Sequence, residues 1–361
     1  MERCVPDIEE PDIEIEYRSE IGRKRVFILV FAILAAFSAF LSLFVTQLED
    51  ISFSDVTEVL KAHITGSQAP NAVFDMIVWD YNVPRALLGA IVGSSLAVGG
   101  AVMQSIMRNP LATPYTTGVS AGASMGAALY IYLDFTILGG TGYLSTIAVN
   151  AIVFAMIPTV AILLVSQQKH ITPTTMILAG IAMMYVFSAA TSLMMLLADP
   201  DHVQESYEWG IGSLGRASWS NIGYVIAGVI PCMIILQILS KQVHIMNAGG
   251  RAATTMGVDV RLIRNISLLV IAVMTAITVG VTGGIGFMGL VAPHLARILV
   301  GSNLRYLLPC SAGIGAVILI VADAVSRVVI PEGIPVGVLT AVIGGPIFIA
   351  ILIKNSKKVW F

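Results

Sequence analysis

The sequence predicts an all-α membrane protein, a polytopic bundle of about ten transmembrane helices. Of its 361 residues, 57% are apolar and only 12% are charged, whereas an ordinary soluble domain carries about 25% charged residues. The apolar residues gather in runs long enough to cross a bilayer, which takes roughly 20 residues per helix. Lipid offers no hydrogen-bond partners, so each spanning backbone must satisfy itself, and the alternation typical of a membrane β-barrel is absent.

The same composition excludes other classes of protein. So few charged side chains could not cover a large soluble core, which excludes a soluble enzyme. The net charge of −2 argues against a nucleic-acid-binding protein, because such proteins carry a basic footprint. The cysteines Cys4, Cys232 and Cys310 stand far apart and form neither a CxxC pair nor a disulfide framework.

Ten apolar segments follow a polar start. Residues 1–25 are mostly acidic, and we expect a loose cytoplasmic tail there, because a secretory signal would begin with basic residues. The transmembrane domain is predicted over 26–353, and residues 354–361 form a cytoplasmic C-terminal tail. If two weak segments were re-entrant, eight spans would remain. The ten predicted spans are 26–46, 84–106, 114–133, 144–166, 174–197, 221–240, 262–282, 287–299, 306–325 and 336–353.

Basic residues indicate the orientation of this multi-pass protein in the cytoplasmic (cell) membrane. With the N-terminus inside, the inner segments hold 16 of the 20 Lys and Arg residues. By the positive-inside rule, both termini are therefore expected in the cytoplasm. The outer segments hold Lys61, Arg85, Arg216 and Arg327. The long outer loop before the second span is expected to contain an amphipathic helix capped by Ser54.

Glycines recur at helical spacing inside the third predicted span. Gly118, Gly122 and Gly126 stand four residues apart, which places them on one helix face and lets two backbones approach closely. Close packing of helices is one interpretation, and a thin-walled transport pathway is the other.

Residues 284–289 match GxGxxG, beginning with Gly284 and Gly286. A dinucleotide-binding motif needs a strand before it and a helix after it, but here the flanks are membrane spans, so we expect a flexible bend. The sequence contains no GxxxxGK[ST] motif, and any ATP-driven work would be done by another chain. The five histidines are scattered, so neither a metal site nor a cofactor is expected.

Two charged residues lie close to the outer end of the ninth span. Asp323 and Arg327 stand four residues apart, the spacing of an ion pair on one helix face. Arg327 could serve this structural pair or bind a partner. No other acidic residue lies deep in a predicted span, which argues against an ion-gradient-driven carrier, since such carriers usually need one.

The inner loop 241–261 contains a stretch of small residues. We expect a short helix over 248–257, closed by Gly257. Such a helix could enter a cleft on a partner protein, and an ordinary connector is the alternative.

Several motifs together resemble one known family. The inner loop reads Arg251-Ala252-Ala253-Thr254-Thr255-Met256-Gly257-Val258. Other stretches are Val83-Pro84-Arg85, Asn109-Pro110-Leu111-Ala112-Thr113-Pro114, Trp209-Gly210-Ile211-Gly212-Ser213-Leu214, Gly283-Gly284-Ile285-Gly286-Phe287-Met288-Gly289, Ile334-Pro335-Val336-Gly337 and Gly344-Gly345-Pro346. In this order they are similar to the FecCD type of ABC importer permease, which carries iron chelates, haem and cobalamin. The resemblance covers roughly 80–361, with the first span before it.

The resemblance implies a type II ABC importer permease that is not itself an enzyme. Such a permease pairs with a second copy of itself around a central pathway, two cytoplasmic ATPase subunits supply the energy, and an extracytoplasmic substrate-binding protein delivers the cargo. Outer arginines of the family pair with glutamates of the binding protein, and Arg85 and Arg327 fall on such positions. The family often has a further arginine where this chain has Asn82. The residues implied to contact the ATPase are Arg251, Ala252, Ala253, Thr254, Met256 and Gly257.

The expected function is therefore import of a metal chelate, with a ferric siderophore as the first expectation and cobalamin or haem as the next. An ion-gradient-driven secondary transporter is the alternative.

Overall fold

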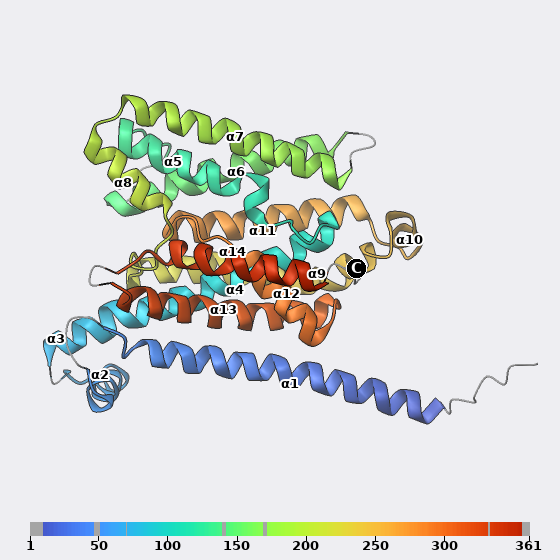
Figure 1. Cartoon of the computed structure of the whole chain (residues 1–361), viewed down its shortest axis with the longest axis horizontal. Helices are drawn as coiled ribbons and strands as arrows, with labels where there is room; N and C mark the ends of the chain where they lie inside the picture. Colours follow the sequence, from blue (N-terminus) through green and yellow to red (C-terminus); the bar gives the residue numbers. More distant parts are fainter. Residues whose placement is uncertain are drawn as a thin grey trace, which may run out of the picture.

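Every element of the described chain is a helix. The computed structural model describes residues 10–46, 51–69, 71–138, 142–168, 172–330 and 333–355, and these contain no β-strand. Figure 1 shows the long helices running side by side in a bundle. The elements are α1 (Glu10–Ser42), α2 (Phe53–Thr65), α3 (Ala72–Asp75), the π-helical η1 (Met76–Asn82), α4 (Val83–Met107), the 3₁₀-helical η2 (Pro114–Thr117), α5 (Val119–Leu133), α6 (Tyr143–Ser166), α7 (Pro173–Leu197), α8 (Pro200–Gly210), α9 (Trp219–Met246), α10 (Gly250–Thr255), α11 (Val260–Thr282), α12 (Met288–Val300), α13 (Leu304–Val328) and α14 (Val336–Asn355).

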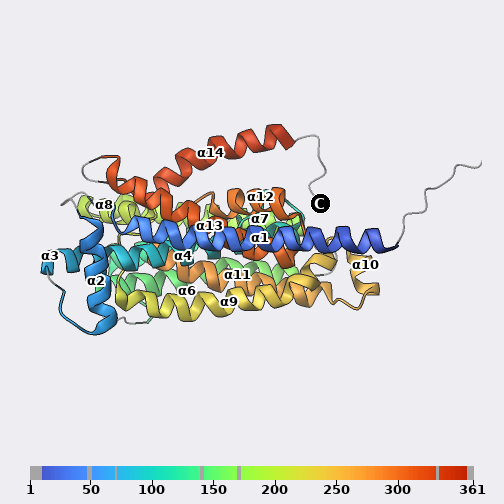
Figure 2. The same cartoon turned by 90° about the horizontal axis from the view of Figure 1, so that it is seen from below.

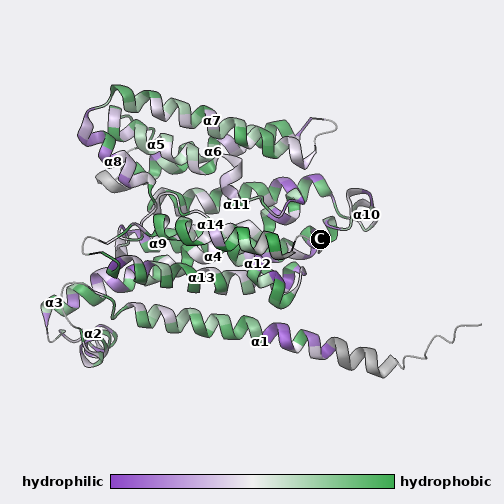
Figure 3. Ribbon diagram, viewed as in Figure 1, coloured by the Kyte–Doolittle hydropathy of each residue, from purple (hydrophilic) through white to green (hydrophobic). Residues whose placement is uncertain are grey.

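Ten apolar helical stretches correspond to the ten predicted spans. Seven are long and apolar enough to cross a membrane by length and composition, and the shorter α5, α12 and α14 supply the rest. Figure 3 shows apolar residues along the helices and many of the polar residues near the ends of the bundle. These observations confirm the predicted all-α membrane fold.

Helix α4 lies at the centre of the bundle and packs against α9, α11, α12 and α13. Two of these contacts require glycine. A Cβ atom on Gly93 would lie 2.3 Å from the carbonyl oxygen of Gly315, and one on Gly100 would lie 2.0 Å from that of Gly289. Both separations are far below van der Waals contact, so α4 meets α13 and α12 backbone to backbone.

The remaining helices flank this centre. Helices α5, α6 and α7 pack together on one side, and α6 joins them to α11. Helix α1 runs along α13 at the opposite edge of the bundle (Figure 1). Figure 2 shows α14 leaning away from the other helices.

The two ends of the bundle carry different short helices. We call them the α2 end, which also holds α3, η1 and α8, and the α10 end (Figures 1 and 2). Arginines tie helices together at the α10 end: Arg108 donates a hydrogen bond to the Met246 carbonyl, and Arg261 donates one to that of Gln167. These bonds fix the last turn of α4 to α9 and the first turn of α11 to the end of α6.

The expected loose tail is wrong for residues 10–25, because α1 already begins at Glu10. Pro11 stands in the first turn, where a missing N–H costs nothing. An ion pair between Lys24 and Glu20, four residues apart and 3.1 Å from nitrogen to oxygen, supports the helix further along. The rest of the predicted N-terminal tail and most of the C-terminal tail, from residue 356 on, lie outside the described residues.

Two helix starts also differ from expectation. Helix α2 is capped by Ser52, not Ser54: the Ser52 hydroxyl accepts from the Asp55 N–H, and the Asp55 carboxylate accepts from the Ser52 N–H. The helix leading into the second span begins at Ala72 rather than at residue 84. Pro84 follows the wide π-helical turns of η1. An inserted π turn is one way a helix absorbs an irregularity in its hydrogen bonding.

Candidate coupling and docking sites

The short helix α10 lies between α9 and α11 and is flanked by two glycines, Gly249 and Gly257. Gly249 has φ of +119° and Gly257 has φ of +80°, a region of backbone conformation that glycine adopts without strain. Ala253, between them, is fully buried, and Val258, directly after Gly257, is nearly so. The Val258 N–H donates to the Ala253 carbonyl at 3.0 Å. The buried pair anchors α10 to the bundle, where it contacts α9 and α11.

The remaining residues of this segment face outward. Arg251, Thr254 and Gly257 are exposed, Ala252 is partly buried, and Met256 is 61% exposed. The Thr254 hydroxyl donates to the Gly250 carbonyl at 2.8 Å within the helix itself. The exposed surface of α10 is therefore small and mixed, with one cation, two threonines and a methionine, and such a surface suits a contact with a cleft of another protein. The predicted 248–257 helix is thus present, shortened by its two glycines.

At the α2 end, one buried carboxylate holds two arginines from different helices. Asp323 of α13 is only 2% exposed. The Arg85 Nε atom of α4 lies 2.9 Å from both Asp323 oxygens, and its Nη2 atom lies 2.9 Å from Oδ1. The Arg327 Nη2 atom lies 3.2 Å from Oδ2. The predicted Asp323–Arg327 pair is confirmed. The contact of Arg85 with Asp323 was not predicted, because 238 residues separate the two.

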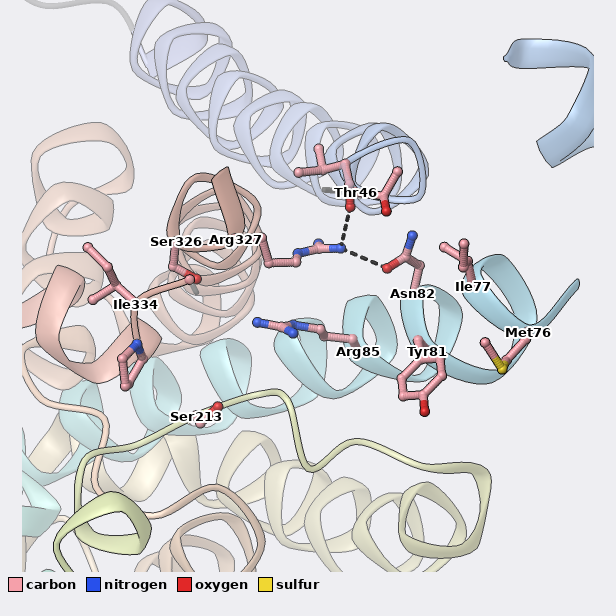
Figure 4. Close-up of a pocket in the computed structure, with 13 residues that line it drawn as sticks. Thr46, Met76, Ile77, Tyr81, Asn82, Arg85, Ser213, Ser326, Arg327 and Ile334 are labelled. Carbon is pink, nitrogen blue, oxygen red and sulfur yellow. Dashed lines mark hydrogen bonds between the residues drawn. The ribbon is translucent and has the colours of Figure 1, made fainter. Parts of the chain in front are cut away.

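Asn82 extends this network to α1. The Arg327 Nη1 atom donates to the Asn82 side-chain oxygen at 2.9 Å and to the Val45 carbonyl at 3.0 Å (Figure 4). The Asn82 amide in turn donates to the Leu43 carbonyl at 2.9 Å, and Asn82 is buried. Where the resemblance leads one to expect a third arginine, this chain therefore has a bridging amide that receives Arg327.

A cavity of about 480 Å³ opens beside these groups. Figure 4 shows Arg85 reaching into it between Arg327 and Ser213. Met76 and Tyr81 of η1 and the turn at Pro335 complete its wall. The cluster of Arg85, Arg327 and Asp323 carries a net charge of +1, so the cavity favours an anionic group.

The predicted glycine stripe lies between helices. A Cβ atom on Gly122 would lie 2.6 Å from the Phe154 carbonyl oxygen, and one on Gly126 would lie 2.5 Å from that of Asn150. Gly118, at the start of α5, has φ of +82° and faces Gly180 of α7. The stripe therefore lets α5 approach α6 and α7 closely, which is the packing interpretation.

The bend after α11 holds Gly284 and Gly286, and it is cross-linked by hydrogen bonds rather than loose. The Ile285 N–H donates to the Tyr115 hydroxyl at 3.0 Å, and the Ser213 N–H donates to the Thr282 carbonyl at 2.7 Å. The backbones crowd so closely that a Cβ atom on Gly212 would lie 2.4 Å from the Gly284 carbonyl oxygen.

Within the described residues, no group of three or more His, Cys, Asp or Glu side chains could hold a metal ion.

In the described residues, ten apolar helices, a small exposed helix at one end and a charged cavity at the other form an architecture typical of a membrane transport subunit. The chain belongs to the FecCD transport family, whose model matches residues 33–354. It is 34% identical over 292 residues to the hemin transport system permease protein HmuU of Yersinia pestis, covering 78% of this chain and 84% of that one. It is 32% identical over 285 residues to the iron(3+)-hydroxamate import system permease protein FhuG of Bacillus subtilis, covering 78% and 85%.

A solved structure supports the same assignment. The chain matches, with a TM-score of 0.79 and 27% identity, an inward-facing conformation of a transporter assigned to the metal-chelate type of ABC transporter, covering 91% of this chain and 98% of that one. Homologues in this family are permease subunits whose ATPase activity lies on separate subunits. The chain is thus an ABC importer permease subunit and not an enzyme, and nothing supports an ion-gradient-driven carrier.

Proposed function

We propose that this permease imports a metal chelate across the cytoplasmic membrane, with a ferric siderophore as the first candidate and haem or cobalamin as the next. The hydroxamate and hemin permeases among its relatives support this class of cargo. Growth of a chelate-uptake-deficient strain on single chelates, rescued by this gene with its neighbours, tests the choice. Rescue by a ferric siderophore alone is expected, and rescue by cobalamin alone would overturn it.

We further propose that the α10 end faces the cytoplasm and binds two ATPase subunits, one for each copy of the permease in a dimer. The observation that carries this assignment is the exposed face of α10, at the end of the bundle where Arg108 and Arg261 lie. Closure of the ATPases on ATP would move α10, and its buried Ala253 would pass the motion to α9 and α11. The free energy then comes from nucleotide on the partner, which shifts the permease between outward and inward access.

The opposite end is proposed to receive an extracytoplasmic binding protein through Arg85 and Arg327. The variant Arg85→Glu reverses the more exposed of the two charges while Arg327 still neutralises Asp323, so affinity for the binding protein should fall about tenfold or more at low salt. The loss should shrink as ionic strength rises, because salt screens charges beside an open cavity. Lys61→Glu, which reverses an exposed charge on α2, is the control. Unchanged affinity of Arg85→Glu at low salt would overturn the docking assignment.

A further inference from the structure

The ion-pair cluster of Asp323, Arg85 and Arg327 holds one cation in excess of its single carboxylate. Asp323 is almost fully buried, yet two guanidinium groups lie within 3.2 Å of its oxygens. A buried carboxylate stripped of every cation is strongly destabilising. With two cations present, either arginine could leave and Asp323 would still be neutralised by the other.

The two arginines are not equally able to leave. Arg327 is held from three sides, by Asp323, by Asn82 and by the Val45 carbonyl, and its side chain is only 10% exposed. The Arg85 side chain is 21% exposed and projects into the cavity (Figure 4). Of the two arginines, Arg85 is therefore the more accessible to a protein that approaches from the α2 end.

We propose that Arg85 is an exchangeable docking cation, which turns from Asp323 to a carboxylate of the binding protein while Arg327 remains on Asp323. This inference rests on the proposed function, since it assumes that the α2 end receives that protein. Asp323 is then an internal competitor for the partner's carboxylate. Because Arg85 belongs to α4 and Asp323 to α13, the exchange also releases a contact between these two central helices when the partner arrives.

The direct test is Asp323→Asn, which keeps the shape of the side chain and removes its charge. Binding-protein affinity is measured on the complete transporter in nanodiscs, with its ATPase subunits present. Without the competitor, the dissociation constant should fall about three- to tenfold, the range of a moderate charge-pair coupling. Asp80→Asn, at an exposed position of η1, is the control, because it removes one negative charge from the same end of the bundle. It should change the dissociation constant less than Asp323→Asn does, and high salt should abolish its effect.

A second pair of variants distinguishes competition by Asp323 from a purely structural role of this residue, with binding-protein affinity as the readout. Arg327→Gln leaves Arg85 as the main counter-charge of Asp323, so Arg85 should be held more tightly and affinity should fall. Adding Asp323→Asn to Arg327→Gln should restore it.

The outcomes separate the two hypotheses. If Arg85→Glu leaves affinity unchanged, docking at this end is itself wrong. If Arg85→Glu weakens binding and Asp323→Asn weakens it too or leaves it unchanged, exchange is overturned and Asp323 only positions Arg85. Should Asp323→Asn fail to assemble, unchanged affinity in Arg327→Gln overturns the exchange instead.

Discussion

A chain in which residues 248–257 are replaced by an unrelated polar linker of equal length is expected to lose ATP-driven chelate uptake completely. The linker removes both the exposed face of Arg251, Thr254 and Met256 and the buried anchor at Ala253. Without them, closure of the ATPases can no longer move α9 and α11. Uptake into vesicles that contain the permease, the ATPase and the binding protein measures the effect.

Two further measurements make this result specific. The variant should still bind its binding protein at the opposite end, because no contact of the Asp323 network involves the replaced residues. Met256→Ala is the milder companion, since it trims an exposed side chain without touching the anchor, and partial loss of uptake is expected. Full uptake after replacement of the whole segment would contradict the coupling role of α10.

The second large effect concerns stability. Gly100→Ala should destabilise the fold severely, because the new Cβ atom would lie 2.0 Å from the Gly289 carbonyl oxygen, a backbone atom that cannot move away alone. Overpacking of this kind costs about 3 kcal/mol, which should lower the melting temperature in detergent by roughly 5 °C or more. Gly93→Ala, facing Gly315, should behave in the same way.

Gly223→Ala is the matched control for these substitutions. Gly223 lies inside α9 with open space where its Cβ atom would be, and alanine is the better helix former. This variant should match or exceed the parent protein in thermal stability. Equal stability of Gly100→Ala and Gly223→Ala would show that α4 does not meet α12 as closely as described.

The membrane fold could be predicted from the sequence because its determinants are local. Long apolar runs and the shortage of charge suffice to locate the spans. The errors fell where a local signal was ambiguous. Pro84 is compatible with a helix start, but α3 and η1 continue the helix back to Ala72. The polar stretch before residue 26 was expected to be unstructured, but from Glu10 on it belongs to α1. Pro11 stands in the first turn, where a helix tolerates proline, and Glu20 forms an ion pair with Lys24 one turn further on.

The site could be predicted only where its residues are neighbours in the chain. The Asp323–Arg327 pair follows from helical spacing. The addition of Arg85 does not, because it depends on how closely α4 approaches α13, which glycines such as Gly93 and Gly315 determine. The role of Asn82 likewise depends on the position of the Leu43 carbonyl at the end of α1. Sequence indicated which arginines to examine, and tertiary packing decides how each is held.

Cross-linking from α10 combined with transport tests the central claim most directly. Met256→Cys in a Cys4→Ser background presents one exposed thiol at α10, since Cys232 and Cys310 are buried. In proteoliposomes with the ATPase and the binding protein, this thiol should cross-link to the ATPase, and chelate should accumulate only when ATP is supplied. Uphill transport by the permease alone on an ion gradient, or attachment of α10 to the binding protein instead, would contradict the account.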